Sequence, residues 1–226
     1  MKNVVHFSGG KDSTAMLLMM LEHNIPIDYV IFCDTGKEFP AMYKHIEKVE
    51  AYTGLEITRL KAPKSFDYYM FDHVKTRGKN KGKCGYGWPT MGIRWCTTML
   101  KQQPAKRFMK DLDGECMEYI GIAADEPKRH INIAPNIRHP LYDWGITEAM
   151  ALKYCYDKGF DWDGLYEHFK RVSCWCCPLK SLPELKALYE FYPELWQKLR
   201  QMDEKAYNQF RSNASVQGIE KRFKGV

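Results

Sequence analysis

A short polar segment near the start of the chain has the residue types that bind phosphate. The segment reads S-G-G-K-D-S, from Ser8 to Ser13. Gly9 and Gly10 allow backbone N–H groups to approach an anion closely, and a helix expected to begin near Ser13 would direct its positive end at the same place. The hydroxyls of the two serines add hydrogen-bond donors, and Lys11 adds a counter-charge. The segment therefore predicts a phosphate-binding loop.

Asp12 separates this loop from the common nucleoside triphosphate loop, G-x-x-x-x-G-K-[ST]. In that pattern Ser or Thr follows the lysine, whereas Asp12 follows Lys11 here. The first glycine of the pattern is also missing, because Val5 stands in its place. We expect Asp12 to cap the helix or to help hold Mg²⁺ through water. The loop is therefore not predicted to serve γ-phosphate chemistry of the common kind.

The cysteines form a second group of residues with chemical potential. Cys174-x-x-Cys177 is followed by proline and has ligand spacing for Zn²⁺ or an iron–sulfur cluster. No targeting or membrane segment is visible, so we expect a cytoplasmic protein in which the eight cysteines do not form structural disulfides. Four interpretations stay open for them: an iron–sulfur cluster, structural zinc, redox-active thiols, and unbound cysteines.

The rest of the chain must position these two groups. Its 226 residues suffice for one α/β domain, and its net charge of +6 permits a polyanionic partner without requiring one. Apolar runs separated by helical segments predict a parallel sheet of about five strands flanked by helices, in a Rossmann-like fold. A Gly- and Lys-rich stretch at 76–92 is predicted to be a mobile loop over a site. The predicted strands fall at 3–7, 29–35, 56–62, 116–126 and 138–144.

Two domains are expected along the chain. Residues 1–150 are predicted to form the nucleotide-binding α/β domain. Residues 151–226 are predicted to form a helical C-terminal extension that carries the Cys-x-x-Cys motif and packs on the same domain.

Five segments together resemble the phosphoadenosine phosphosulfate (PAPS) reductase-like family. The loop S-G-G-K-D-S resembles the PP-loop of the ATP pyrophosphatase, or adenine nucleotide α-hydrolase, superfamily to which that family belongs. Four later segments resemble motifs of the family in the same order, over residues 1 to about 200. They are CDTGKEFPAMYKHIEKV (33–49), WCTTMLKQQP (95–104), GIAADEPKR (121–129) and PLYDW (140–144).

The resemblance implies an adenine nucleotide α-hydrolase-like fold and further site residues. Asp34, Thr35 and Gly36 would line the nucleotide site at the end of the second strand. Asp125 would position Mg²⁺ or the ribose, with Glu126 as a weaker candidate. Arg129 would hold a phosphate or sulfate. With Lys11, Asp12 and Cys96, Arg129 completes the predicted catalytic set.

The resemblance also bears on the metal ligands. Cys96 lies in the segment where iron–sulfur adenylyl-sulfate reductases carry a Cys-Cys pair, but Trp95 replaces the first member. Cys84 would supply the missing thiolate, so the predicted ligands are Cys84, Cys96, Cys174 and Cys177. Otherwise three cysteines would hold a [4Fe-4S] cluster with one open iron. Zn²⁺ is the alternative metal.

Three functions follow from the resemblance. The first is ATP-dependent adenylation with release of pyrophosphate, coupled to sulfur transfer. The second is a sulfonucleotide reductase that acts on PAPS or adenylyl sulfate and releases sulfite. It is opposed by the absence of a cysteine after Cys177, where thioredoxin-dependent PAPS reductases carry a catalytic one. The third is a nucleotide-binding subunit of a nucleic-acid modification or defence system.

The partners expected are a small-molecule nucleotide and a sulfur-donor or electron-donor protein. The basic segment 77–83 permits nucleic acid, although a solvated lid over phosphates is the favoured interpretation. No membrane partner is expected, and the sequence indicates no oligomeric state.

Overall fold

The predicted parallel sheet is present, with the strand order β3-β2-β1-β4-β5. In the computed structural model, which describes residues 1–225, every neighbouring pair of strands runs parallel. Val5 of β1 pairs with Val30 of β2 on one side and with Tyr119 of β4 on the other. The strands are β1 (Lys2–His6), β2 (Tyr29–Asp34), β3 (Ile57–Lys61), β4 (Cys116–Ile120) and β5 (Ile137–Arg138).

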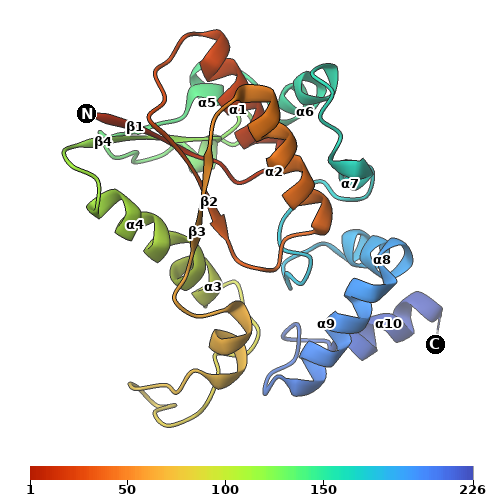
Figure 1. Cartoon of the computed structure of the whole chain (residues 1–226). Helices are drawn as coiled ribbons and strands as arrows, with labels where there is room; N and C mark the ends of the chain where they lie inside the picture. The colour runs from red at the N-terminus through yellow and green to blue at the C-terminus, as the bar shows by residue number, and fades with distance from the viewer. Residues whose placement is uncertain (226) are drawn as a thin grey trace. The chain divides into compact units, whose positions relative to one another are not determined.

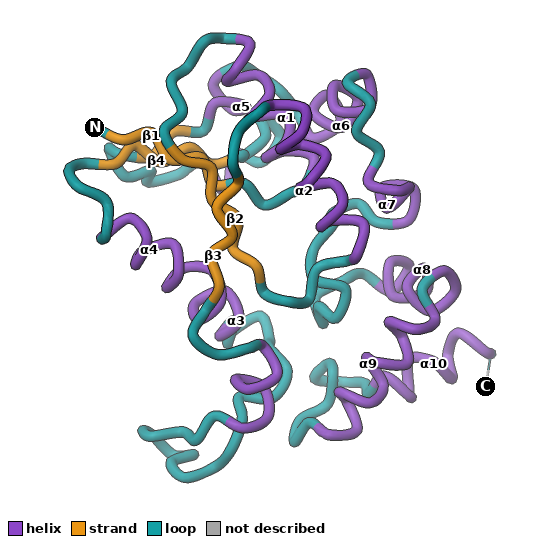
Figure 2. The backbone as a smooth tube through the Cα atoms, viewed as in Figure 1, coloured by secondary structure: helices purple, strands orange, loops and turns teal. Residues whose placement is uncertain are grey.

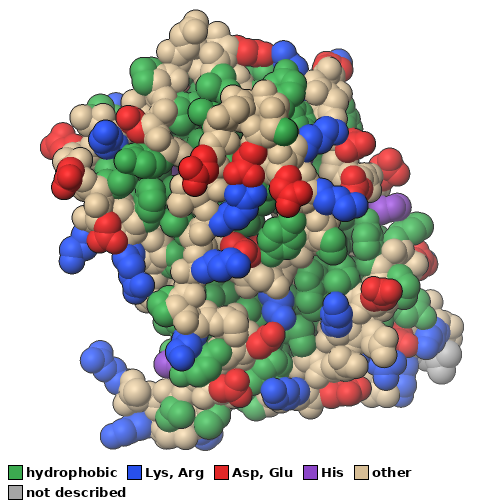
Figure 3. Space-filling model, viewed as in Figure 1, with side chains coloured by type: hydrophobic (Ala, Val, Ile, Leu, Met, Phe, Trp, Pro, Cys, Tyr) green, Lys and Arg blue, Asp and Glu red, His purple; other side chains and the backbone are tan. Residues whose placement is uncertain are grey.

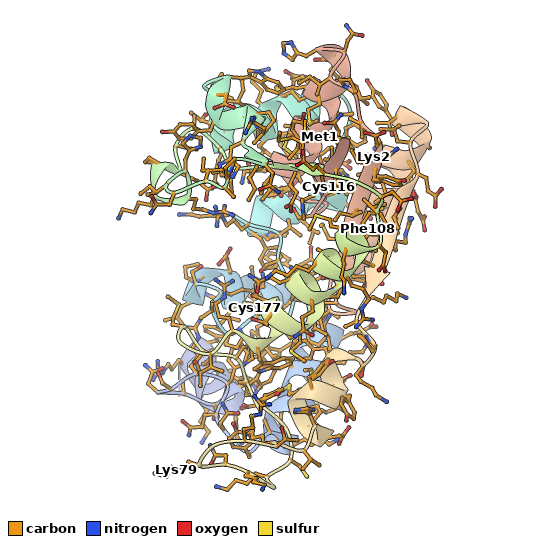
Figure 4. The ribbon with its side chains drawn as sticks, turned by 90° about the vertical axis from the view of Figure 1, so that its left-hand side faces the viewer. Met1, Lys2, Lys79, Phe108, Cys116 and Cys177 are labelled. Carbon is orange, nitrogen blue, oxygen red and sulfur yellow. The ribbon has the colours of Figure 1, made fainter. Side chains whose placement is uncertain are left out.

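The connections place helices on both faces of this sheet. In Figure 1, α1 (Lys11–Glu22) and α2 (Pro40–Thr53) cover one face, and α4 (Gln103–Lys110) lies on the other. Successive side chains of a strand point to opposite faces of the sheet. On the face covered by α4, Val4 and Ile31 form one core cluster with Ala105. Phe108 and Cys116, both labelled in Figure 4, pack against the same cluster. The sheet is therefore doubly wound, as the sequence predicted.

Local signals in the sequence explain where several helices begin and end. Gly54 closes α2 in the left-handed conformation, with a φ of +70°. The Thr147 hydroxyl accepts a hydrogen bond from Met150 N and caps α6 (Glu148–Asp157), as predicted. Pro104 has no N–H, and the helix that contains it is interrupted just before it by a π-helical turn, η2 (Thr98–Gln102).

The fifth strand is shorter than the sequence indicated. The prediction covered 138–144, but β5 ends at Arg138. The helix α5 (Pro140–Asp143) takes up most of the remainder. Pro140 stands in the first turn of that helix, where its missing N–H costs no hydrogen bond. A short apolar run of this kind cannot be assigned to strand or helix by periodicity alone.

The chain forms two compact units, and the sheet belongs to the first. Unit 1 contains residues 1–34, 39–61 and 104–166, and unit 2 contains residues 35–38, 62–103 and 167–226. Unit 1 also includes η3 (Pro127–Arg129) and η4 (Trp162–Gly164), while α7 (Leu165–His168) begins in unit 1 and ends in unit 2. The expected boundary at residue 150 does not coincide with this division, because α6 packs along α1 and segment 62–103 clusters with the C-terminal residues.

Unit 2 is built from short helices and long loops (Figure 2). Buried tryptophans organise it, and several of them donate the indole N–H to an acceptor within the unit. Trp88 donates to Asp203 Oδ1 at 2.9 Å, and Trp95 donates to the Gly87 carbonyl at 3.0 Å. The helical segments of unit 2 are η1 (Tyr68–Asp72), α3 (Trp95–Thr97), η2, α8 (Leu182–Phe191), α9 (Pro193–Lys205) and α10 (Val216–Lys224). Among residues 1–225, no helix combines the length and apolar character needed to cross a membrane.

Candidate functional site

The predicted phosphate loop joins β1 to α1, and its backbone has the expected shape. Gly9 adopts a φ of +76°, a conformation that strains any other residue, and a Cβ there would also displace the end of the Met42 side chain. Gly10 is the N-cap of α1, which begins at Lys11 rather than near Ser13. The N-terminus of α1 therefore opens directly behind the two glycines.

The two serines of the loop bind each other and the loop backbone. Their hydroxyl oxygens lie 3.0 Å apart, and Ser13 Oγ donates to the Gly10 carbonyl at 3.0 Å. Ser13 Oγ also accepts a hydrogen bond from Ser8 N at 3.1 Å. The sequence indicated hydroxyl donors for a phosphate. In this structure, the hydrogen bonds of both serines stabilise the turn itself.

Two aromatic side chains from the far end of unit 1 hold the same loop. Trp162 Nε1 donates to the Gly9 carbonyl at 2.7 Å, and Tyr166 accepts a hydrogen bond from Lys11 N at 2.7 Å. The Trp162 ring stacks on buried His45 with centroids 4.3 Å apart, and His45 Nε2 lies 2.9 Å from Thr14 Oγ1 in α1. Sequence reasoning missed these residues, because a contact across more than 150 positions leaves no local pattern.

Lys11 lies in a partly buried ionic group at the start of α1. Its side chain is only 5% exposed, and its ammonium contacts Glu148 Oε2 at 3.0 Å and Asp12 Oδ2 at 3.4 Å. Burial raises the pKa of Asp12 to about 6, although Lys11 opposes that shift. Asp12 Oδ1 is buried and has no hydrogen-bond partner among the described residues. Glu148 was not predicted, since it lies 137 positions from Lys11.

The segment after β4 approaches the same loop. Gly121 lies so close to α1 that a Cβ there would be 3.0 Å from Ser13 N. Asp125 Oδ1 accepts a hydrogen bond from Glu148 N at 3.0 Å, which links this segment to the start of α6. Arg129 pairs with Glu126 through contacts of 3.0 and 2.7 Å. The loops that follow β1 and β4 thus meet where the strand order reverses, the usual ligand position in open parallel sheets.

The three residues predicted at the end of β2 are divided between the units. Asp34 belongs to unit 1, where it accepts a hydrogen bond from the Tyr43 hydroxyl at 2.8 Å and pairs with Lys61 at 3.4 Å. Thr35 and Gly36 belong to unit 2. The Thr35 hydroxyl donates to Glu38 Oε1 at 2.7 Å and lies 3.5 Å from Cys174 Sγ. Thr35 is therefore a neighbour of the cysteine group.

Three of the four predicted metal ligands, Cys96, Cys174 and Cys177, lie close enough within unit 2 to affect one another's thiol pKa values. Burial raises the pKa of Cys96, and a nearby thiolate at Cys177 would raise it further. Burial also raises the pKa of the Cys174 thiol to about 11, and the ammonium of Lys101 opposes the shift at both Cys96 and Cys174. The Cys96 and Cys174 thiols are therefore protonated near neutral pH.

Cys84 differs from the other three predicted ligands. It is exposed and forms an isolated antiparallel bridge with Val74. Within residues 1–225, no three His, Cys, Asp or Glu side chains are arranged to hold a metal ion. Three partly buried thiols with cations nearby suit a soft metal in their chemistry, but the arrangement is not that of a formed site. The metal set therefore stays a prediction from the sequence.

The remaining cysteines have the structural surroundings expected of small apolar residues. All eight cysteines are free thiols. Cys33 and Cys116 pack against the core cluster beneath α4. Cys155 is fully buried, and burial raises its pKa to about 12.

With the fold and both residue groups placed, comparison with known proteins assigns the family. Residues 2–180 match the phosphoadenosine phosphosulfate reductase domain, and the chain belongs to that family. The fold is similar to the crystal structure of a phosphoadenylyl-sulfate reductase from Candida auris in a phosphate complex. The TM-score is 0.52 at 19% sequence identity, over 77% of this chain and 82% of that one.

Curated relatives are longer than this chain. An uncharacterized protein of Methanocaldococcus jannaschii is 28% identical over 214 residues, which cover 86% of this chain and 40% of that protein. An uncharacterized nin region protein of Escherichia phage lambda is 31% identical over 171 residues, which cover 67% of this chain and 58% of that protein. The chain thus spans about half the length of these relatives.

Proposed function

We propose that the chain binds ATP through the loop of residues 8–13 and transfers its adenylyl group to an acceptor, releasing pyrophosphate. The observation that carries this proposal is the position of the loop. Gly9 and Gly10 lead straight into the N-terminus of α1, where backbone N–H groups and the helix dipole favour an anion. The loop lies at the switch point of the sheet, and the chain belongs to the phosphoadenosine phosphosulfate reductase domain family, which is named after a sulfonucleotide.

In this reaction an acceptor oxygen attacks the α-phosphorus, and the bond to the β-phosphate breaks. Negative charge then develops on the departing pyrophosphate, where preorganised donors and cations are most effective. Lys11 is the cation available in the loop, and Glu148 fixes its ammonium. Arg129 carries a second cationic group beyond β4, on an exposed turn. Lys11 and Arg129 are therefore the residues assigned to the charge on the phosphates.

The thiols of unit 2 are assigned to the sulfur side of the proposal. A persulfide on one of Cys96, Cys174 and Cys177, received from the persulfide of a donor protein, would attack the adenylated acceptor through its outer sulfur and displace AMP. A second of these thiols would then attack the inner sulfur, which releases the thiolated acceptor and leaves a disulfide that an electron-donor protein reduces. If these three thiolates instead held a [4Fe-4S] cluster, they would leave one iron without a protein ligand. Thr35 and Glu38 contact Cys174 and fix its side chain.

The reaction is tested with ATP labelled at the α-phosphate. Purified protein is incubated with Mg²⁺, ATP and a pool of small RNAs and metabolites, and labelled AMP and pyrophosphate are measured. Pyrophosphate in amounts equal to labelled AMP or adenylylated product supports the proposal. Release of orthophosphate and ADP would contradict it, because cleavage would then be at the γ-phosphate.

Sulfonucleotide reduction is the second candidate, and the family match favours it directly. In that case the loop would bind PAPS or adenylyl sulfate, and a thiol would attack the sulfur. Sulfite release from either nucleotide, with dithiothreitol as reductant, distinguishes this activity from adenylation. Binding of both sulfonucleotides without any sulfite would exclude it.

A further inference from the structure

A hairpin in unit 2 carries a regular series of cations. Its sequence, K-T-R-G-K-N-K-G-K, places a basic residue at every second position from Lys75 to Lys83. The intervening residues are Thr, Gly, Asn and Gly, so the segment contains neither an acid nor an apolar side chain. We call residues 74–84 the basic hairpin. Its cations are Lys75, Arg77, Lys79, Lys81 and Lys83.

Backbone hydrogen bonds shape this segment. Lys75 N donates to the Lys83 carbonyl at 3.0 Å, and Gly82 N donates to the Lys75 carbonyl at 2.8 Å. Gly78 and Gly82 have positive φ angles, which allow the chain to turn twice without strain. Figure 4 labels Lys79 at the tip of the hairpin, and Figure 3 shows Lys and Arg side chains of the surface in blue. Arg77, Lys79, Lys81 and Lys83 are all exposed. The hairpin thus presents its charges outward.

No carboxylate of the described residues neutralises the five cations. Within residues 1–225, none of the five forms an ion pair with a carboxylate. The hydrogen bond between Lys75 and Lys83 also places two like charges on neighbouring arms, which is unfavourable by itself. A ligand that carries several negative charges at regular spacing would relieve this repulsion best.

An exposed aromatic ring adjoins the charges. Tyr207 is 65% exposed, and the Lys75 ammonium lies 4.6 Å from its ring centre. The Tyr207 hydroxyl donates to the Tyr86 carbonyl at 2.7 Å, which fixes the ring beside the hairpin. A fixed, exposed ring next to a series of cations is the combination that binds single-stranded nucleic acid, because bases stack while phosphates pair with lysines.

We propose that the basic hairpin and Tyr207 bind a single-stranded segment of nucleic acid. The phosphates contact the five cations, and one base stacks on Tyr207. The basic and polar residues from Lys75 to Lys83 disfavour insertion into a membrane, and the small intervening residues leave room for a sugar–phosphate backbone. This surface is independent of the nucleotide chemistry proposed above, since every residue in it belongs to unit 2.

Fluorescence anisotropy with the full chain tests the proposal. The probes are labelled twelve-nucleotide RNA and DNA strands of one mixed sequence, titrated between 50 and 200 mM KCl. Five phosphate contacts on a single strand give a slope of log K against log salt of about −3.5, which is about 100-fold weaker binding at the higher salt. The two strands show whether the 2′-hydroxyl matters.

Two variants connect the binding to the named residues. Replacing Lys79, Lys81 and Lys83 by Gln is expected to weaken binding at least tenfold at 100 mM KCl and to reduce the slope by about 2. A matched control replaces three exposed lysines on the helices of unit 2, Lys186, Lys198 and Lys221, and so removes the same charge. Tyr207→Leu should weaken binding about tenfold, and Tyr207→Phe should retain most of it.

Three results would overturn the proposal. The first is no anisotropy change with either strand at 50 mM KCl while circular dichroism shows a folded protein. The second is equal weakening by the hairpin variant and its matched control, which would indicate bulk charge alone. The third is a loss of ATP affinity in the hairpin variant with unchanged oligonucleotide binding, which would make the hairpin a nucleotide lid. Wild-type ATP binding, measured separately, reports on the loop of unit 1 and so keeps the two proposals distinct.

Discussion

Trp162 donates a 2.7 Å hydrogen bond from its indole to the carbonyl oxygen of Gly9, so a residue near the end of unit 1 fixes the phosphate loop near the start. The same ring stacks on His45, whose imidazole contacts Thr14 of α1. A buried aromatic group therefore holds the loop at Gly9. This contact gives the first prediction.

Trp162→Phe should keep the stacking on His45 and lose the donor to Gly9. The buried carbonyl would then lack its partner, at a cost of about 1–3 kcal/mol, and the loop would be less well ordered. We expect ATP affinity, measured by isothermal titration calorimetry, to fall about tenfold. Trp144→Phe removes an indole from a ring pair with His23 and serves as the control. Equal ATP affinity in both variants would show that the hydrogen bond does not order the loop.

Tyr166→Phe removes the acceptor of the Lys11 amide. Amide hydrogen exchange at Lys11 should then accelerate about tenfold, because the hydroxyl is the partner of that N–H. Tyr142→Phe, a substitution elsewhere in unit 1, should leave the exchange rate unchanged. Since exchange is measured without nucleotide, the result does not depend on the proposed reaction. Unchanged protection in Tyr166→Phe would mean that the α1 terminus is ordered by other contacts.

Lys11 should contribute to both stability and binding, and a double substitution can separate the two. Lys11→Met leaves the carboxylates of Glu148 and Asp12 without their cation and should lower the free energy of unfolding by about 2 kcal/mol. Adding Glu148→Gln should restore much of that stability. ATP binding should stay absent in both variants. Recovery of ATP binding in the double variant would show that Lys11 has only a structural role.

Asp12 should make stability depend on pH in an unusual direction. Burial raises its pKa from 3.8 to about 6, so the folded protein binds the proton more tightly than the unfolded chain does. The ionised carboxylate therefore lowers stability above pH 6, and protonation relieves this cost as the pH falls from 6 towards 4. Asp12→Asn should raise the free energy of unfolding at pH 7.5 by about 2 kcal/mol and change it little at pH 4.

Urea titrations of Asp12→Asn and wild type at each pH measure this effect. Burial lowers the pKa of His45 from 6.5 to about 3, so the protein also loses stability through His45 as the pH falls from 6.5 towards 3. This range overlaps the range in which Asp12 titrates. Both proteins contain His45, so its contribution cancels in their difference. A difference that is the same at both pH values would contradict the raised pKa of Asp12.

Metal content is expected to depend on three cysteines and not on Cys84. Protein purified without oxygen is analysed by visible spectrum and elemental analysis, where about four irons per chain would establish a cubane cluster. Substitution of Cys96, Cys174 or Cys177 by Ser should abolish the metal. Cys84→Ser should not, because Cys84 is exposed and bridges Val74. Zinc in place of iron would make the same three thiols structural ligands.

The sequence revealed the parts of this protein that have a local signature. The glycines of the loop, the Thr147 cap and Gly54 all follow from backbone chemistry within a few residues, and each is found as predicted. The parallel sheet followed from the alternation of apolar strands and helices. The fifth strand was predicted too long, because proline is compatible with both the edge of a strand and the first turn of a helix, where Pro140 lies.

The contacts that complete each residue group had no such signature. Glu148, Trp162 and Tyr166 reach the loop only through the folding of α6 and the segment after it against α1. Similarly, the contact between Thr35 and Cys174 joins residues 139 positions apart, and no local pattern in the sequence indicated it. Side-chain partners at large sequence separation are decided by tertiary packing, which periodicity does not encode.

The two units are interleaved along the chain, so they cannot be separated at one position. The chain passes from one unit to the other after residues 34, 38, 61, 103 and 166. No single cut yields either unit whole, and a fragment that ends at residue 150 lacks Trp162 and Tyr166, the aromatic support of the loop. A single crossover therefore cannot exchange either unit whole between two such chains.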